Sequence, residues 1–322
     1  MLLVLLPASF CRAQASFGES TLFNQGWKFE LSDASDVADA GFDDSHWQPV
    51  DLPHDWSVKG VLSPDNASCT GFLPGGIAWY RKHFDGSQLT DEHVYIYFEG
   101  VYNRSSVYLN GHLLGERPNG YVSFMYELTP FLNRGGDNVL SVRVDHSRIA
   151  DSRWYTGSGI YRDVYIIGSG DLHFAQWGLG WKLKSIDGKN ATVTVDAAIE
   201  GRPGKTARLN LELVDAEGKV VAKTQTPLKA SQNVDLKLKN SRRWNLDDPY
   251  LYTLKASIVD GGKTIDRSSC KVGLRTLDFN PDKGFALNGE WMKVKGVCLH
   301  HDVGVLGAAV PRDVWKRRLE NL

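Results

Sequence analysis

Residues 106–115 read Ser-Val-Tyr-Leu-Asn-Gly-His-Leu-Leu-Gly, and this stretch decides the fold class. Asn110-Gly111 lies between two short apolar segments, and this dipeptide is the strongest short signal for a β-hairpin. The signal has a physical basis, because both residues of such a turn need positive φ, which Asn and Gly adopt readily. The stretch therefore predicts an antiparallel hairpin within a mainly β protein.

The sequence on both sides of the hairpin continues as short strands separated by turns. Residues 94–98 form an apolar β run, residues 138–144 alternate between apolar and polar side chains, and residues 164–167 form another short run. No amphipathic helix pattern longer than about ten residues interrupts them. We predict an antiparallel sandwich of jelly-roll type over residues 16–170.

A second group of predicted strands follows the Gly-Ser-Gly linker at 168–170. Residues 191–195, 208–214 and 234–238 alternate like half-buried strands, residues 251–258 form a further strand, and a turn is expected at 215–219. Strands that recur every 10–20 residues over about 100 residues are typical of an immunoglobulin-like β-sandwich. We predict this architecture for residues 171–274.

The pattern changes over residues 275–322. Residues 292–298 form a short β run, and after Pro311 the apolar residues Val314, Trp315, Leu319 and Leu322 fall on one face of a predicted helix. One strand followed by one helix is the beginning of an α/β unit. We therefore expect a third kind of structure to start in this segment.

Residues 1–15 are typical of a signal peptide. A short apolar run covers residues 2–6, and Ala13-Gln14-Ala15 has the small-x-small form of a signal-peptidase site. The run is too short to span a bilayer. We expect an exported protein, periplasmic or secreted, with a mature start near Ser16 and no membrane association after signal removal.

Composition excludes several classes of protein. The 322 residues carry a net charge of -1, so no basic excess favours nucleic acid or an anionic membrane. Hydrophobic residues make up 42% and charged residues 23%, which argues against disorder. Aromatic residues reach 11%, and they suit both a β-sandwich core and a surface on which sugar rings stack. Oligomerisation stays open.

Eight short stretches occur in an order that is far more specific than any one of them. They are residues 26–29 (GWKF), 47–56 (WQPVDLPHDW), 79–82 (WYRK), 98–101 (FEGV), 107–111 (VYLNG), 153–164 (RWYTGSGIYRDV), 273–276 (GLRT) and 295–302 (KGVCLHHD). Together they resemble the N-terminal portion of β-galactosidase-like enzymes of glycoside hydrolase family two. The resemblance covers nearly all of the chain after residue 15.

The resemblance implies a jelly-roll sugar-binding domain, an immunoglobulin-like domain and then a catalytic (β/α)8 barrel. Residues 275–322 match only the start of that barrel, whereas a whole barrel needs about 250 residues. The family's two catalytic glutamates lie later in the barrel, so we assign no acid/base and no nucleophile and expect this chain to be inactive alone. The implied activity is retaining hydrolysis of terminal β-linked sugars in glycan degradation.

The sugar and the reaction both have alternatives. Residues 152–162 resemble exported β-galactosidases of glycan-degrading bacteria, so a β-galactoside-type glycan is the expected partner, while β-mannosidase and β-glucuronidase relatives stay open. A stand-alone carbohydrate-binding or scaffold protein is the other reading. The stretch 295–302 favours the enzyme, because a binding module has no need of half a barrel unit.

His300 is the first candidate for a substrate contact. It directly follows the predicted barrel strand, at the carboxyl end where barrel active sites form. The resemblance implies that this histidine reaches the substrate and donates to a sugar hydroxyl. The alternative is a buried histidine bonded to barrel backbone. His301 and Asp302 are weaker candidates, for supporting or metal-binding roles.

Arg153, Trp154 and Tyr155 are the second set of candidates. The resemblance implies that this loop reaches the barrel mouth and helps to close the subsite for the terminal sugar. Well-known members carry aspartate where Arg153 stands, so Arg153 could accept a charged substituent instead, and Trp154 or Tyr155 could stack on a sugar face. The alternative for all three is packing at a domain interface.

Other chemistry finds little support in the sequence. His54-Asp55 is expected to be structural, because no serine or cysteine lies in a nucleophile-elbow sequence. No cysteine or histidine spacing indicates a metal site, and no cofactor motif is evident. A metal held by residues of a barrel beyond residue 322 stays open.

Overall fold

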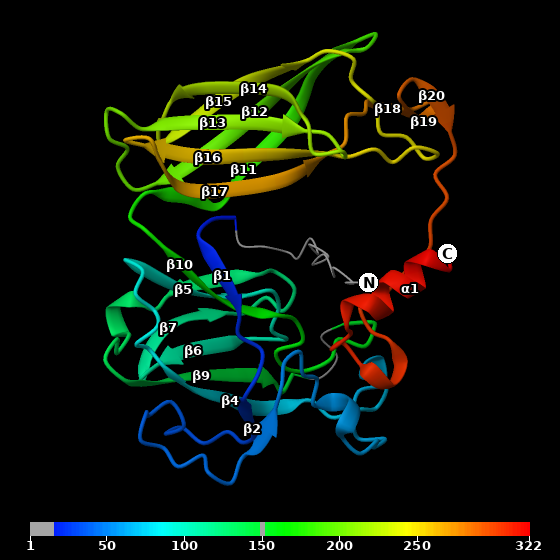
Figure 1. The fold of residues 1–322 in the computed structure, drawn as a ribbon. Coiled ribbons are helices and arrows are strands. Elements are labelled where there is room, and N and C mark those ends of the chain that lie inside the picture. Colours follow the sequence, from blue (N-terminus) through cyan, green and yellow to red (C-terminus); the bar gives the residue numbers. More distant parts are fainter. Residues whose placement is uncertain (1–15, 149–151) are drawn as a thin grey trace, which may run out of the picture. The chain divides into compact units, whose positions relative to one another are not determined.

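The computed structural model describes residues 16–148 and 152–322 (Figure 1). The expected signal peptide, residues 1–15, lies outside the described residues. The chain divides into two compact units. The jelly-roll unit comprises Thr21–Gly168 with Gly296–Leu322, and the immunoglobulin-like unit comprises Ser169–Lys295 with residues 16–20.

The jelly-roll unit is a sandwich of two antiparallel sheets. A six-stranded sheet has the order β3-β2-β4-β9-β6-β7, and a four-stranded sheet has the order β1-β10-β5-β8 (Figure 1). The strands are β1 (Glu19–Leu22), β2 (Trp27–Leu31), β3 (Gln48–Val50), β4 (Gly76–Asp85), β5 (His93–Phe98), β6 (Ser105–Leu109), β7 (His112–Arg117), β8 (Phe124–Glu127), β9 (Asp137–His146) and β10 (Val164–Ser169). Short 3-10 turns lie at η1 (Ser57–Lys59), η2 (Ser68–Thr70) and η3 (Thr129–Phe131). The predicted sandwich is confirmed.

The predicted hairpin joins β6 to β7. Leu109 pairs with His112, and the turn residues Asn110 and Gly111 have φ of 51° and 85°. The Asn110 side chain also accepts from the Val139 amide at 2.8 Å and so fixes the turn to β9. Val107 and Leu109 are fully buried, where they join a core drawn from both sheets.

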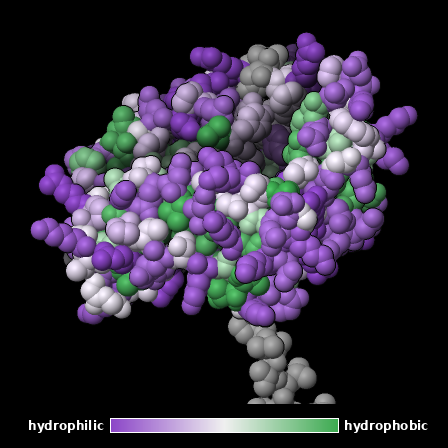
Figure 2. Space-filling view, turned by 90° about the horizontal axis from the view of Figure 1, so that it is seen from above, coloured by the Kyte–Doolittle hydropathy of each residue, from purple (hydrophilic) through white to green (hydrophobic). Residues whose placement is uncertain are grey.

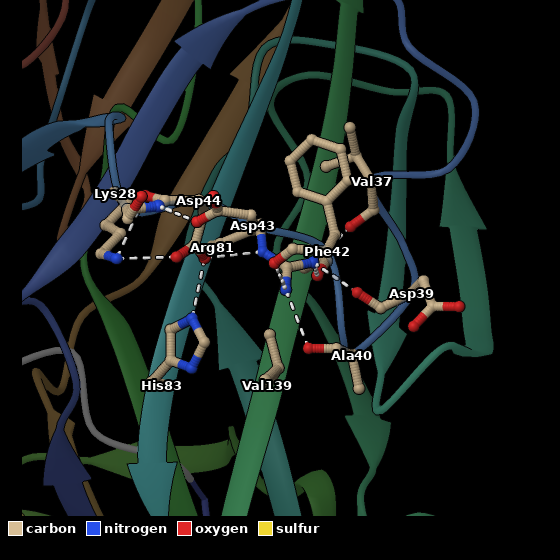
Figure 3. Close-up of polar contacts among 12 residues, drawn as sticks. Lys28, Val37, Asp39, Ala40, Phe42, Asp43, Asp44, Arg81, His83 and Val139 are labelled. Carbon is tan, nitrogen blue, oxygen red and sulfur yellow. Dashed lines mark hydrogen bonds and ion pairs between the residues drawn. The ribbon is translucent and has the colours of Figure 1, made fainter.

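A buried arginine fastens the segment before β3 to the sheet (Figure 3). Arg81 of β4 is completely buried, and its Nε donates to Asp44 Oδ2 at 2.8 Å. Its other nitrogens donate to backbone carbonyls of the segment, at Val37, Asp39, Ala40 and Phe42. These bonds satisfy polar groups that would otherwise be buried without partners. Arg81 thus attaches residues 37–44 to β4.

Asp44 receives three cationic or potentially cationic side chains. Lys28 Nζ lies 2.6 Å from Oδ1, while Arg81 Nε and His83 Nε2 each lie 2.8 Å from Oδ2. Burial alone would raise the pKa of Asp44, but hydrogen bonds from Lys28, His83 and Arg81 outweigh burial and hold its pKa well below the usual range.

The depressed pKa of Asp44 predicts acid sensitivity. A carboxyl whose pKa is lower in the folded state stabilises the fold above its unfolded pKa, and loses that contribution as pH falls toward the folded pKa. We expect the free energy of unfolding to fall between about pH 5 and about pH 3. Urea titrations across this range should show a shallower fall for Asp44→Asn. Identical slopes in the two proteins would contradict the assignment.

The immunoglobulin-like unit contains two further sheets. One has the order β11-β12-β15 and the other β14-β13-β16-β17. The strands are β11 (His173–Asp187), β12 (Asn190–Glu200), β13 (Arg208–Val214), β14 (Val220–Pro227), β15 (Ser231–Leu238), β16 (Tyr252–Asp260) and β17 (Lys263–Val272). Alternate residues of β13 are buried, and the expected turn closes with the Asp215 amide on the Lys219 carbonyl at 2.9 Å. The second predicted sandwich is confirmed.

The outer face drawn in Figure 2 is mostly hydrophilic, with small separate groups of hydrophobic side chains. This agrees with the alternation of apolar and polar residues along the strands.

No helix among the described residues has both the length and the apolar character needed to cross a bilayer.

The expected strand over residues 292–298 is wrong. A small sheet of β18 (Leu277–Asn280), β19 (Gly284–Leu287) and β20 (Glu290–Met292) ends at Met292, and no regular structure follows until η4 (Gly304–Leu306). A strand needs a hydrogen-bonded neighbour, and no described strand pairs with residues 293–298. The helix expected after Pro311 is confirmed as α1 (Arg312–Glu320), although Leu319 is 59% exposed.

Candidate functional site

The candidate residues come from two segments of the jelly-roll unit. Residues 152–159 belong to the connection from β9 to β10, and residues 300–308 precede α1. The two segments meet beside the turn that begins at Asp55 and contains η1 (Figure 1). The structure thus brings together, within one unit, two stretches that the sequence analysis singled out separately.

Trp154 and His300 lie side by side at the surface. Their ring centroids are 5.6 Å apart, and the indole is 37% exposed. The indole Nε1 donates to the Tyr121 hydroxyl at 3.1 Å, which fixes the direction of the ring. Since Tyr121 is also exposed, the three side chains form an open aromatic patch with imidazole at its edge.

His301 is half-buried and contacts the jelly-roll loop. Its ring packs against the rings of Tyr121 and Tyr161, each with a centroid distance of 5.5 Å. Its Nε2 lies 2.9 Å from the Thr156 carbonyl, which can only accept, so this nitrogen carries the hydrogen. His300, in contrast, is exposed and has no hydrogen bond to any described residue. His300 is therefore free to meet a ligand.

The hydroxyl of Tyr155 points inward, toward a buried carboxylate. Its hydroxyl donates to Asp55 Oδ2 at 2.6 Å. Burial, followed by the negative charge of Asp55, raises the pKa of Tyr155 far above its usual value, so the phenol stays protonated and remains a donor. This hydroxyl is occupied by Asp55 and supports the loop beneath Trp154.

Arg153 is exposed on the same loop. It forms no hydrogen bond or ion pair with any residue among 16–148 and 152–322. Its guanidinium is always charged and suits bidentate contact with a carboxylate. The residue is thus available for a ligand, although no contact in the structure assigns one.

His54 and Asp55 are both buried, as a structural role requires. His54 Nδ1 lies 2.9 Å from the Tyr80 hydroxyl, and burial lowers the pKa of His54 to about 4, so the ring is neutral. Asp55 does more than the sequence analysis expected, because it accepts from Tyr155 and from the Ala308 amide, 100 and 253 positions away. No sequence signal marks such distant partners.

A cavity of about 340 Å³ lies on the same unit. Its lining includes Asp65, Asn66, Thr70, His146 and Arg148. His146 Nδ1 lies 2.6 Å from Ser158 Oγ, which lies 2.5 Å from Ser57 Oγ. The cavity wall is therefore connected by hydrogen bonds to the turn that holds Asp55.

Among the described residues no three His, Cys, Asp or Glu side chains are placed to bind a metal.

Two family models match the chain. The sugar binding domain of glycosyl hydrolases family 2 matches residues 13–169, and a second model of glycosyl hydrolases family 2 matches residues 176–275. The chain belongs to glycosyl hydrolase family 2.

Individual relatives within the family are glycosidases. A β-galactosidase of Bacteroides ovatus is 41% identical over 94% of this chain and 37% of its own length. A β-glucuronidase of Formosa agariphila is 30% identical over 85% of this chain and 31% of its own length. The crystal structure of a β-glycosidase from Bacteroides vulgatus has a TM-score of 0.90 and 40% identity, and covers 94% of this chain and 40% of that one. The chain spans about two fifths or less of these proteins.

Proposed function

We propose that this chain is the non-catalytic N-terminal part of an exported glycoside hydrolase that releases terminal β-linked sugars with retention of configuration. Residues 275–322 are the start of its catalytic barrel in this proposal. The observation that carries it is the Trp154–His300 patch, where a loop of the family's sugar-binding domain meets the segment that contains the KGVCLHHD stretch. Export is supported by residues 1–15, and N-terminal sequencing of a secreted product that starts at Met1 would count against it.

The residues at the patch have distinct chemical tasks. The face of Trp154 offers the flat apolar surface on which the C–H face of a sugar ring packs. His300 offers an imidazole donor to a sugar hydroxyl, and this bond strengthens as the ring flattens toward the oxocarbenium-like transition state. Tyr155 anchors the loop through its bond to Asp55, and Tyr121 orients the indole through its bond from Trp154 Nε1.

A β-galactoside is the favoured substrate. It is supported by the relative of highest identity described above, which is a β-galactosidase. A β-glucuronide is the second candidate, because exposed Arg153 offers a guanidinium for a sugar carboxylate and another relative is a β-glucuronidase. The two sugars differ in the carboxylate at C6 and in the configuration at C4, so a binding comparison separates them.

Binding of methyl β-galactoside to the chain should depend on Trp154. We expect weak binding in NMR titrations and a loss of about fivefold in affinity for Trp154→Ala, because aromatic packing of this kind contributes about 1 kcal/mol. Trp177→Ala is the matched control, since Trp177 is an exposed tryptophan of the other unit. Equal losses in both variants would contradict the proposal. Stronger binding of the glucuronide that is lost in Arg153→Gln would instead select the second candidate.

A further inference from the structure

We propose that Asp55 is a positioning residue that fixes residues 300–308, and with them His300, against the loop that carries Trp154. This inference rests on the proposed function for its catalytic meaning. Asp55 itself touches no substrate, because the residue is only 2% exposed.

The Asp55 carboxylate collects four donors from three separate parts of the chain. Oδ1 accepts from the amides of Ser57 and Ser158, each at 3.0 Å. Oδ2 accepts from the Tyr155 hydroxyl at 2.6 Å and from the Ala308 amide at 2.9 Å. All four donors are neutral, so the carboxylate is held by directed hydrogen bonds and not by an ion pair.

Two glycines bring the partner segments close enough for these bonds. A Cβ on Gly157 would lie 2.7 Å from Asp55 Oδ2, and a Cβ on Gly307 would lie 2.3 Å from the same atom. Both residues also have positive φ, of 70° and 57°. Only glycine satisfies both conditions without strain, so both segments are shaped to receive this carboxylate.

The hydrogen bond from the Ala308 amide to Asp55 also positions the residues that precede Ala308. The Val303 amide donates to the Gly307 carbonyl at 2.9 Å, so residues 303–307 form a closed turn. Ala308 is buried beside Tyr102 and Tyr161. Because His301 packs on Tyr161 just before this turn, fixing Ala308 sets the place of His301 and of its neighbour His300.

An amide in place of the Asp55 carboxylate cannot accept all four hydrogen bonds. Each oxygen of Asp55 already accepts two donors, so the NH2 group of an asparagine faces two donors in either orientation. Asp55→Asn therefore breaks two of the four bonds. Gly307→Ala disturbs the contact between Asp55 and residues 307–308 without changing Asp55, since its new Cβ collides with Asp55 and Val58.

Hydrogen exchange and histidine NMR on the whole chain, without sugar, test this inference. We expect Asp55→Asn and Gly307→Ala to speed amide exchange of residues 301–310 by about tenfold. The His301 ring resonances, which the rings of Tyr121 and Tyr161 displace, should move toward their free values. The amides of β4 and β9 should keep their protection. Gly304→Ala is the matched control, because Gly304 has positive φ in the same turn but open space around its Cβ.

Unchanged exchange and unchanged His301 resonances in both variants would overturn the inference. If Asp55→Asn unfolds the sandwich, Gly307→Ala decides, since its substitution lies outside the sandwich strands. An effect of Gly304→Ala equal to that of Gly307→Ala would also overturn it. Because no sugar is present, the result is independent of the Trp154 binding experiment, and either proposal can fail alone.

Discussion

Arg81→Met should lower the free energy of unfolding of the jelly-roll unit by about 3–5 kcal/mol, because Asp44 loses its fully buried partner and keeps only the more exposed Lys28 and His83. Arg81 is fully buried and Asp44 is 4% exposed. The carbonyls of residues 37–42 that Arg81 satisfies lose their donor as well. Denaturant unfolding followed by hydrogen exchange of β4 and β9 measures the loss within this unit.

Arg242→Met is the matched control for Arg81→Met. Arg242 also pairs with an aspartate, Asp248, but its side chain is 54% exposed. An exposed pair contributes little to stability, because solvent screens it. The double substitution Arg81→Met with Asp44→Leu should recover part of the loss, since it removes both buried charges. Equal losses for Arg81→Met and Arg242→Met would show that burial does not govern the effect.

The purified chain should release nitrophenol from aryl β-glycosides no faster than the uncatalysed background. Retaining hydrolysis needs two carboxyl groups about 5–5.5 Å apart across the scissile bond. General acid catalysis alone contributes about 10²–10⁴-fold. Asp55, the carboxylate bonded to this loop, is buried and already accepts four hydrogen bonds. His300 alone cannot serve both faces of the sugar.

A panel of nitrophenyl β-galactoside, β-glucuronide and β-mannoside tests this expectation. His300→Ala is the internal control, and it should give the same background as the unaltered chain. Turnover that falls in His300→Ala would mean that the chain carries its own catalytic machinery, and the proposal of a non-catalytic N-terminal part would fail.

The sequence predicted those parts of the fold that depend on neighbouring residues. The Asn110-Gly111 turn and the alternation of β13 are local features, and both appear where expected. Residues 292–298 show the limit of the same reasoning. Their apolar residues suit a strand, but a strand also requires a partner that a local pattern does not reveal.

The candidate site was predictable only in part. Resemblance to a family placed Trp154 and His300 among the candidates, and the structure brings the two rings together. The inward turn of Tyr155 was missed, because it depends on a buried carboxylate 100 positions earlier in the chain. The same is true of Arg81, whose partners lie on a segment some 40 positions away.

The Asp55 junction has a consequence for building hybrid glycosidases. A recombinant that takes residues up to about 290 from this chain and the remainder from a relative would take Asp55 and the Ala308 amide that donates to it from different parents, since Ala308 lies 253 positions later. If the relative carried any residue other than glycine at the Gly307 position, its Cβ would lie 2.3 Å from an Asp55 carboxylate oxygen. Exchange points placed after residue 310 would keep the two halves of this junction in the same parent.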